Sequence, residues 1–401
     1  MKKLVLHIGT EKTGTTSIQS MLSQNRQRFK AQGFHVLECA GEENHRLLPS
    51  IFIAKPDPFL KLSVNESGLG KAAFIEHVKK TIADEIRSLP KHVHTVITSS
   101  EHCQSRLKTA EEVAALHDFL VQFFDEIKVV CYVREQSAMC TSLYSTALKV
   151  GYKESIDEFA QSCHSGNIYY NHLKMLNLWS EAFGHESVCV KRFDFGEFVN
   201  NSLLDDFLSQ IDTSLIDIID KNVPRENESL NFMGQILSRS LNEAIPAQPE
   251  RPIENQLRHD LKEFLYNNFK GKGAPLPYEK IANIYDDFEQ SNLELNQRYL
   301  GGEGNAFPLP KYDENQGIQS VTSEQISAFA HLIEFIYKLG QRDSLEANEV
   351  ELLRDAAIKL EDIDMNMSLR LMLQARLHRP TGALINKKIG DYQKILAAKK
   401  L

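Results

Sequence analysis

Residues 9–16 combine residue types and a spacing that suit a phosphate group. The stretch reads GTEKTGTT, in which four residues separate Gly9 from Gly14. Glycines let the backbone approach an anion closely, and the amides of residues 13–16 would point into such a cradle. Lys12 lies three residues before the place that lysine takes in the ATP-binding loop, where it directly follows the second glycine. We therefore expect Lys12 on the far side of the phosphate, near the group bonded to it.

The elements on either side of this loop suit an anion site. Residues 2–9 read as a buried strand, and residues 15–32 read as a helix. A helix that begins directly after the loop would present its positive dipole end to the anion. The alternative is a glycine turn that binds nothing, but the lysine and the threonines cluster where a phosphate would need them.

Strand and helix patterns alternate over the first half of the chain. The strand patterns are short and rich in β-branched residues, and the helix patterns have apolar residues at helical spacing. Strands are predicted at 33–39, 92–100, 127–133 and 186–193, and helices at 71–89, 110–124, 135–150 and 171–183. The alternation predicts an α/β fold, with a central, mainly parallel sheet and helices on both faces. Ligands of such sheets collect beyond the carboxyl ends of the strands.

A second motif follows the predicted strand at 127–133. The stretch CYVREQSAMCTS places Arg134 at the end of this strand and Ser142 eight residues later, in the next helix. Together with the loop pattern K-[ST]-G-[TG]-[TS], here residues 12–16, it resembles the sulfotransferases that use 3'-phosphoadenosine 5'-phosphosulfate (PAPS). The resemblance implies a P-loop-like sulfotransferase fold, extends more weakly over roughly residues 3–300, and is strongest to the bacterial members.

The resemblance also implies which residues bind the donor. Arg134 and Ser142 would hold the 3'-phosphate of PAPS, and Arg225 would either add charge there or belong to a helix cap. The 5'-phosphosulfate would be held by the loop residues Lys12, Thr13, Gly14, Thr15 and Thr16. In the cytosolic small-molecule enzymes of this family the loop continues into tryptophan, whereas here Ser17 follows. This departure leaves the class of acceptor open.

Sulfuryl transfer requires a general base for the acceptor and a cation on the leaving side. Lys12 would be that cation. Glu101 and His102 follow the predicted strand at 92–100, and members of the family use either a glutamate or a histidine as the base. We favour Glu101, because many relatives have a Ser-Glu pair at this place. The alternative is that His102 is the base and that Glu101 caps the next helix or pairs with a basic neighbour.

Three further residues are candidates for binding the acceptor: His45, Tyr169 and His172. Each could instead be an ordinary surface or core residue. The family resemblance suggests a hydroxyl or amine on a glycan or a glycolipid as the acceptor, with 3'-phosphoadenosine 5'-phosphate (PAP) as the product nucleotide. Cys, His, Asp and Glu show no structural zinc spacing and no Asp-rich motif suggests magnesium, so no metal is expected.

The composition limits the partners of the protein. The net charge of -8 argues against broad binding to nucleic acid or anionic membranes. No apolar stretch reaches the roughly 20 residues of a membrane-spanning helix, so we expect no transmembrane segment and a cytoplasmic location.

The strand patterns fade after about residue 200. We predict a sulfotransferase α/β domain at 1–300, a glycine- and proline-rich linker at 301–317, and a helical C-terminal extension at 318–401. The extension contains one tetratricopeptide-like hairpin pattern, with small or apolar residues at Ala356, Ser368, Met372 and Ala375. Its amphipathic helices need a partner surface, which could be the core domain, a second copy of the chain or the acceptor.

Two other functions compete with this interpretation. A P-loop kinase or NTPase would need a lysine after Gly14 and an aspartate at a strand end for magnesium, and neither is evident. A non-catalytic, nucleotide-binding scaffold protein would not need Lys12, Arg134, Ser142 and an acidic residue at a strand end together. The sequence therefore favours the enzyme.

Overall fold

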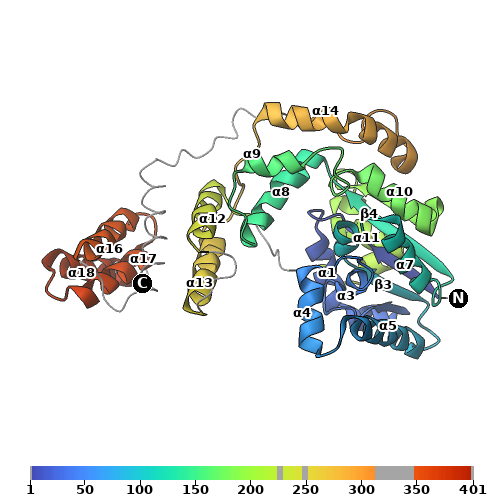
Figure 1. The fold of residues 1–401 in the computed structure, drawn as a ribbon, viewed down its shortest axis with the longest axis horizontal. Helices are drawn as coiled ribbons and strands as arrows, with labels where there is room; N and C mark the ends of the chain where they lie inside the picture. The colour runs from blue at the N-terminus through green and yellow to red at the C-terminus, as the bar shows by residue number, and fades with distance from the viewer. Residues whose placement is uncertain (1, 224–228, 246–251, 312–346, 399–401) are drawn as a thin grey trace. The chain divides into compact units, whose positions relative to one another are not determined.

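The computed structural model describes residues 2–223, 229–245, 252–311 and 347–398 (Figure 1). It contains a five-stranded sheet in the order β2-β3-β1-β4-β5. The strands are β1 Lys3–His7, β2 Phe34–Val36, β3 Thr95–Ser99, β4 Glu126–Val133 and β5 Val188–Arg192. All pairings in this sheet are parallel, which confirms the predicted α/β fold.

Helices account for most of the remaining elements. Those before the middle of the chain are α1 Thr15–Gln24, α2 Arg26–Ala31, α3 Leu47–Ser50, α4 Pro58–Ser67, α5 Lys71–Ser88, α6 His102–Arg106, α7 Ala110–Leu120, α8 Gln136–Lys149, α9 Ile156–Phe159 and α10 His172–Phe183. Those that follow are α11 Leu203–Ile211, α12 Phe232–Ala244, α13 Pro252–Asn268, α14 Tyr278–Leu295, α16 Ala347–Leu360, α17 Met365–His378 and α18 Ala383–Ala398. Within the described ranges, no helix combines the length and the apolar character needed to cross a membrane.

The predicted helix at 15–32 is two helices, because Asn25 interrupts it. Both the backbone amide and the side-chain amide of Asn25 donate to the carbonyl of Met21, at 3.2 and 2.9 Å. An Asn side chain competes in this way with the helical backbone pattern, and α2 begins at the next residue.

Both faces of β1 are buried because helices pack on both sides of the sheet. Leu4, Leu6 and Ile8 belong to one core, to which α5, α7 and α10 also contribute. Val5 belongs to a second core on the other face, together with residues of α1 and α11. This alternation is the period of two that a strand imposes on its side chains.

The chain packs as two compact units that interleave along the sequence. The first unit comprises Met1–Cys140, Ala160–Asn227 and Pro277–Lys311, and it contains the whole sheet. The second comprises Thr141–Phe159, Glu228–Leu276 and Tyr312–Leu401. The division falls inside α8.

The second unit has a hydrophobic core of its own. Its buried residues come from α12, α13, α16, α17 and α18, and they include Leu237, Leu265, Leu353, Met372 and Tyr392. Three positions of the tetratricopeptide-like pattern, Ser368, Met372 and Ala375, are buried in this unit.

This packing does not follow the boundaries that we predicted from the sequence. Helices α12 and α13 precede the predicted linker, yet they share a core with helices that follow it. Ala306 and Phe307, inside the predicted linker, are buried in the core of the first unit, and residues 312–317 lie outside the described residues. The domain boundaries therefore stay a prediction.

One carboxylate fastens the end of β2 to α5. Glu85 accepts hydrogen bonds from Nε2 of His35 at 2.7 Å and from the amides of Glu38 and Cys39, both at 2.8 Å. Burial acts to raise the pKa of Glu85, but the hydrogen bonds, led by that of His35, lower it to about 2. The ionised carboxylate therefore stabilises the fold.

We predict that Glu85→Gln lowers the free energy of unfolding of the first unit by about 1–2 kcal/mol at neutral pH, because the amide is a weaker acceptor. The native pKa of Glu85, about 2, lies below the ordinary value of 4.5. The stabilisation that its ionised carboxylate gives is therefore fully present above pH 4.5 and is lost as the pH falls toward 2. Urea unfolding followed by the fluorescence of Trp179, the chain's one tryptophan, measures it.

Glu76→Gln, at an exposed position of the same helix, is the matched control and should change the stability by less than about 0.5 kcal/mol. A difference between wild type and Glu85→Gln that stayed constant down to pH 2 would contradict the prediction.

Candidate active site

The loop after β1 runs beside β4 before it turns into α1. The amide of Ile8 donates to the carbonyl of Val130 at 3.0 Å, and that of Thr10 donates to the carbonyl of Tyr132 at 2.8 Å. The hydroxyl of Thr10 donates to the same carbonyl at 3.1 Å. The β1–β4 ladder thus continues past the end of β1 and fixes where the turn of residues 11–14 begins.

Two residues of this turn have left-handed backbone, Lys12 with φ of 68° and Gly14 with φ of 76°. Glycine adopts this conformation readily, whereas a left-handed lysine is uncommon and depends on surrounding contacts. Here the hydroxyl of Thr13 donates to the carbonyl of Thr10 at 2.6 Å, and Nη1 of Arg134 donates to the carbonyl of Lys12 at 3.0 Å. These contacts define the shape of the turn.

The turn leads into the N-terminus of α1. Gly14 is the N-cap residue, and Thr15 and Thr16 belong to the first helical turn. The first N–H groups of a helix have no partners within it and carry the positive end of its dipole. The predicted phosphate cradle and a helix N-terminus therefore coincide.

Arg134 lies directly after β4, beside the loop. Its guanidinium lies 5.6 Å from the ring centre of Phe193. Burial lowers the pKa of Arg134, although an arginine keeps its proton in proteins. His172, at the start of α10, donates from Nε2 to the carbonyl of Arg134 at 2.7 Å. The backbone and the side chain of Arg134 are thus both held, and its positive charge lies next to the loop.

Glu101 lies at the same edge of the sheet, two residues after β3. A Cβ atom on Gly9 would lie 3.1 Å from the Cα of Glu101, so the loop and Glu101 pack closely. Nε2 of Gln19 donates to the Glu101 carboxylate at 2.5 Å. Burial raises the pKa of Glu101, the hydrogen bond from Gln19 opposes this, and the charge of Glu11 raises it further. A raised pKa suits a carboxylate that acts as a general base.

His102 follows Glu101 and begins α6. Burial, and next the charge of Arg46, lower the pKa of His102 to about 4, so that the ring is neutral at neutral pH. Its Nδ1 atom is buried and has no hydrogen-bond partner. Glu101 occupies the N-cap position of α6 but makes no side-chain capping hydrogen bond, so the structure does not support the capping alternative.

Tyr169 connects the loop to the residues before α10. Its hydroxyl donates to the carboxylate of Glu11 at 2.6 Å, and its carbonyl accepts from Nε2 of Gln104 at 2.9 Å. Burial, and next the charge of Glu11, keep the pKa of this hydroxyl well above its ordinary value. Tyr169 therefore lies within the same edge cluster as the loop, where it holds Glu11.

The two histidines predicted to bind the acceptor are both buried. Nδ1 of His45 accepts from the amide of Ser99 at 3.0 Å and from the hydroxyl of Thr98 at 2.9 Å, at the end of β3. Burial, and next Arg26, lower the pKa of His45 to about 4, and burial lowers that of His172 to about 4 as well. Both rings are therefore neutral and secure strand ends, and acceptor binding by either of them stays a prediction.

Ser142 is half-buried in α8 and belongs to the second unit, so its part in donor binding also stays a prediction. Arg225 lies outside the described residues. Among the residues that the structure describes, no group of three or more His, Cys, Asp or Glu is arranged to hold a metal ion.

The site contains residues that the sequence interpretation missed. Gln19 lies four residues after Thr15, which is about one helical turn, and this spacing could have placed it on the same side of α1. Glu11 directly precedes Lys12, so the sequence indicated that it lies near the site. The sequence did not indicate that Glu11 contacts Tyr169. No sequence signal indicated Gln104.

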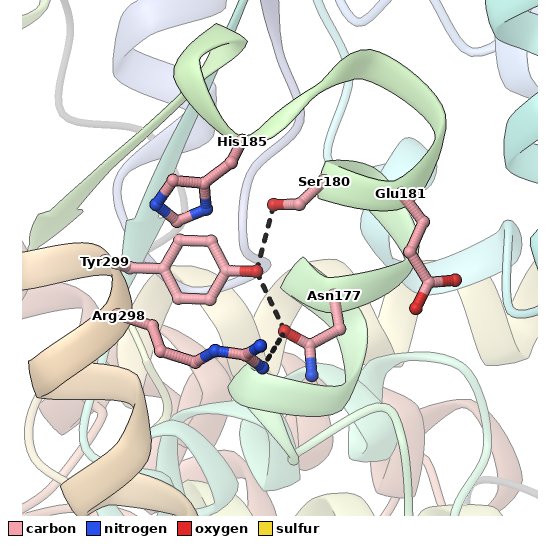
Figure 2. Close-up of a pocket in the computed structure, with 6 residues that line it drawn as sticks. All are labelled: Asn177, Ser180, Glu181, His185, Arg298 and Tyr299. Atoms are coloured by element: carbon pink, nitrogen blue, oxygen red, sulfur yellow. Dashed lines mark hydrogen bonds between the residues drawn. The ribbon is translucent and has the colours of Figure 1, made fainter.

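A pocket of about 430 Å³ lies away from this cluster, along the second half of α10 (Figure 2). Tyr299, in the π-helix Asn296–Leu300 that follows α14, bonds through its hydroxyl to Ser180 and to the side-chain oxygen of Asn177, both at 2.9 Å. Arg298 donates to the same oxygen at 3.1 Å. These bonds tie the segment that follows α14 to α10, and none of the predicted site residues lines the pocket.

We predict that Gly14→Ala destabilises the first unit more than Gly68→Ala does. Both glycines have positive φ, 76° and 68°, so a left-handed alanine should cost about 1–2 kcal/mol at each position. At Gly14 the new methyl group would also lie 2.3 Å from Cδ2 of Leu203, whereas nothing lies within 4 Å at Gly68. Urea unfolding followed by Trp179 fluorescence compares the two variants, and equal losses would show that Leu203 moves away freely.

Comparison with known proteins finds a family model that is similar to the first part of the chain. The family model described as "Sulfotransferase domain" matches residues 2–188. An uncharacterized protein of Archaeoglobus fulgidus is 24% identical over 178 residues, which are 43% of this chain and 46% of that protein. The chain thus spans about half the length of this curated relative.

Two solved structures are also similar to the chain. A sulfotransferase from Alicyclobacillus acidocaldarius covers 74% of this chain and 95% of its own, with a TM-score of 0.38 and 11% identity. A retinol dehydratase, in complex with androsterone and the inactive cofactor PAP, covers 87% and 84%, with a TM-score of 0.25 and 13% identity. The residues matched by the sulfotransferase domain model include the loop, Glu101 and Arg134.

Proposed function

We propose that this protein is a sulfotransferase that moves the sulfuryl group of PAPS to a hydroxyl or amine of a carbohydrate or lipid-linked acceptor. The observation that carries the proposal is the arrangement at the sheet edge. The N-terminus of α1 and the guanidinium of Arg134 adjoin the loop of residues 9–16. Glu101 packs against Gly9 of the same loop, and its carboxylate accepts from Gln19 of α1. The two anionic groups of the donor would find N–H and cationic partners there, and Glu101 would lie beside them as the general base.

Different residues around the loop would bind the two anionic groups of PAPS. The α1 amides and Lys12 would hold the 5'-phosphosulfate, because a helix N-terminus and a lysine both favour negative charge. Arg134, with Ser142 as the resemblance implies, would hold the 3'-phosphate. A guanidinium gives planar, charge-assisted hydrogen bonds to a phosphate, which supports this assignment of Arg134.

The chain can also supply the proton transfer that the reaction needs. Glu101 would take the acceptor proton as the acceptor oxygen or nitrogen attacks the sulfur. Lys12 would offset the negative charge that develops on the departing nucleotide phosphate. His102 is the alternative base, and its pKa of about 4 keeps it in the neutral form that a base requires.

We predict that PAP binds and stabilises the protein, whereas ATP with magnesium does so poorly. At a PAP concentration one hundred times the Kd, the free energy of unfolding should rise by about 2.7 kcal/mol. Arg134→Ala should weaken PAP binding by about 10- to 100-fold, because a charge-assisted hydrogen bond is lost. Isothermal titration calorimetry measures these affinities.

Arg298→Ala, an exposed arginine of the same unit away from the loop, is the matched control and should bind PAP like wild type. Equal PAP affinity in wild type and Arg134→Ala would overturn the donor assignment. Tighter binding of ATP-magnesium than of PAP would instead support a kinase or NTPase. If neither nucleotide bound, the proposal that PAPS is the donor would be wrong.

We predict that Glu101→Gln lowers turnover by about 10²- to 10⁴-fold while the Kd for PAP stays nearly unchanged, because a general base is lost. Release of PAP from PAPS in the presence of a panel of glycan and glycolipid acceptors measures turnover. His102→Ala is the comparison. A larger loss in His102→Ala, with Glu101→Gln still active, would exchange the two roles.

A further inference from the structure

Gln19 links the proposed base to the helix that begins at the phosphate cradle. The residue is only 4% exposed, and its side chain donates from Nε2 to the Glu101 carboxylate at 2.5 Å. The same nitrogen lies 3.5 Å from the carbonyl of Ser99, at the limit of a hydrogen bond. The short contact with Glu101 is therefore the main partner of this buried amide.

Helix α1 carries both the cradle and this contact. Thr15, in its first turn, and Gln19 are four residues apart, and residues at this spacing lie on the same side of a helix. The rise along α1 between them is about 6 Å. One rigid element thus carries both the N–H groups of the cradle and a hydrogen-bond donor to the Glu101 carboxylate.

Glu11 acts on the same carboxylate from the loop. Its own carboxylate is held by the hydroxyl of Tyr169 at 2.6 Å, and its amide lies 3.5 Å from Oε1 of Gln104. The position of its negative charge is therefore fixed by tertiary contacts.

We propose that Gln19 is a positioning residue, which orients the carboxylate of Glu101 relative to the phosphate cradle and favours its ionised form. The inference rests on the proposed function, in which Glu101 is the base. Glu11 has the opposite effect, because a second negative charge disfavours ionisation of Glu101.

The groups around Glu101 determine the sign of each effect. The loop contributes Glu11, and the N-cap position of α3 contributes Arg46, whose charge favours the ionised carboxylate. Helix α6 contributes His102 and Arg106, Asp57 pairs with both arginines, and α1 has no charged residue in Thr15–Gln24. Loss of the Gln19 hydrogen bond should raise the pKa of Glu101, and loss of the Glu11 charge should lower it.

The test compares Gln19→Met, Glu11→Gln and wild type in the pH dependence of PAP release from PAPS with the acceptor panel. A base must be ionised, so the rate falls as the pH drops through its pKa. In Gln19→Met this acid limb should move to higher pH, with kcat lower by about tenfold at neutral pH and the Kd for PAP unchanged. In Glu11→Gln the acid limb should move to lower pH.

Gln24→Met, at an exposed position of α1, is the matched control and should leave the acid limb in place.

A second readout does not depend on turnover. Infrared difference spectra between each protein and its Glu101→Gln counterpart report the carboxyl titration of Glu101 directly. The titration should move upward in Gln19→Met and downward in Glu11→Gln, even if the protein proves not to use PAPS. Absence of PAP binding and of PAP release in wild type would overturn the proposed function, whereas these spectra would still decide the link between Gln19 and Glu101.

Two results would overturn the inference itself. One is an unmoved acid limb and an unmoved Glu101 titration in Gln19→Met, whether or not Glu11→Gln shifts, since His102 also responds to Glu11. The other is loss of PAP binding in Gln19→Met, which would show that the residue only supports α1.

Discussion

The site depends on the parallel register of β1 between β3 and β4. His7 lies opposite Ser99 and Val130, so the chain leaves β1 and β3 at the same level of the sheet. The ladder then continues past β1, through the amide of Thr10 and the carbonyl of Tyr132. These bonds hold the first residues of the loop in place. They therefore help to stabilise the left-handed backbone conformation of Lys12, which is uncommon for a residue other than glycine.

The polar groups at this edge are held by one another in a largely buried setting. His45 accepts from the end of β3, His172 donates to the residue after β4, and Tyr169 donates to Glu11. Burial lowers the pKa values of both histidines, so they hold the strand ends without adding charge. The charges that remain at the loop are those of lysine, arginine and carboxylate side chains, which are the groups that anion binding and proton transfer require.

The two compact units show how little chain order constrains packing. Helices α12 and α13 follow the sheet in sequence, but their apolar faces lie in the same core as α16, α17 and α18. The segment with Ala306 and Phe307 looks like a linker by its glycines and prolines, yet both side chains are buried in the first unit. A composition rich in turn residues predicts irregular backbone, and irregular backbone can still pack against a core.

The sequence by itself determined the features that depend on short-range pattern. The alternation of strands and helices, the glycine-framed loop with Lys12, and the places of Glu101 and Arg134 after strands follow from periods of two and 3.6 residues and from turn residues. Tertiary structure alone decided the features that join distant segments. Gln19 meets Glu101 across 82 residues and Tyr169 meets Glu11 across 158, and no local period encodes such contacts. The sharing of a core by α12 and α16 likewise depends on which surfaces meet when the chain packs, because burial is a property of the whole fold.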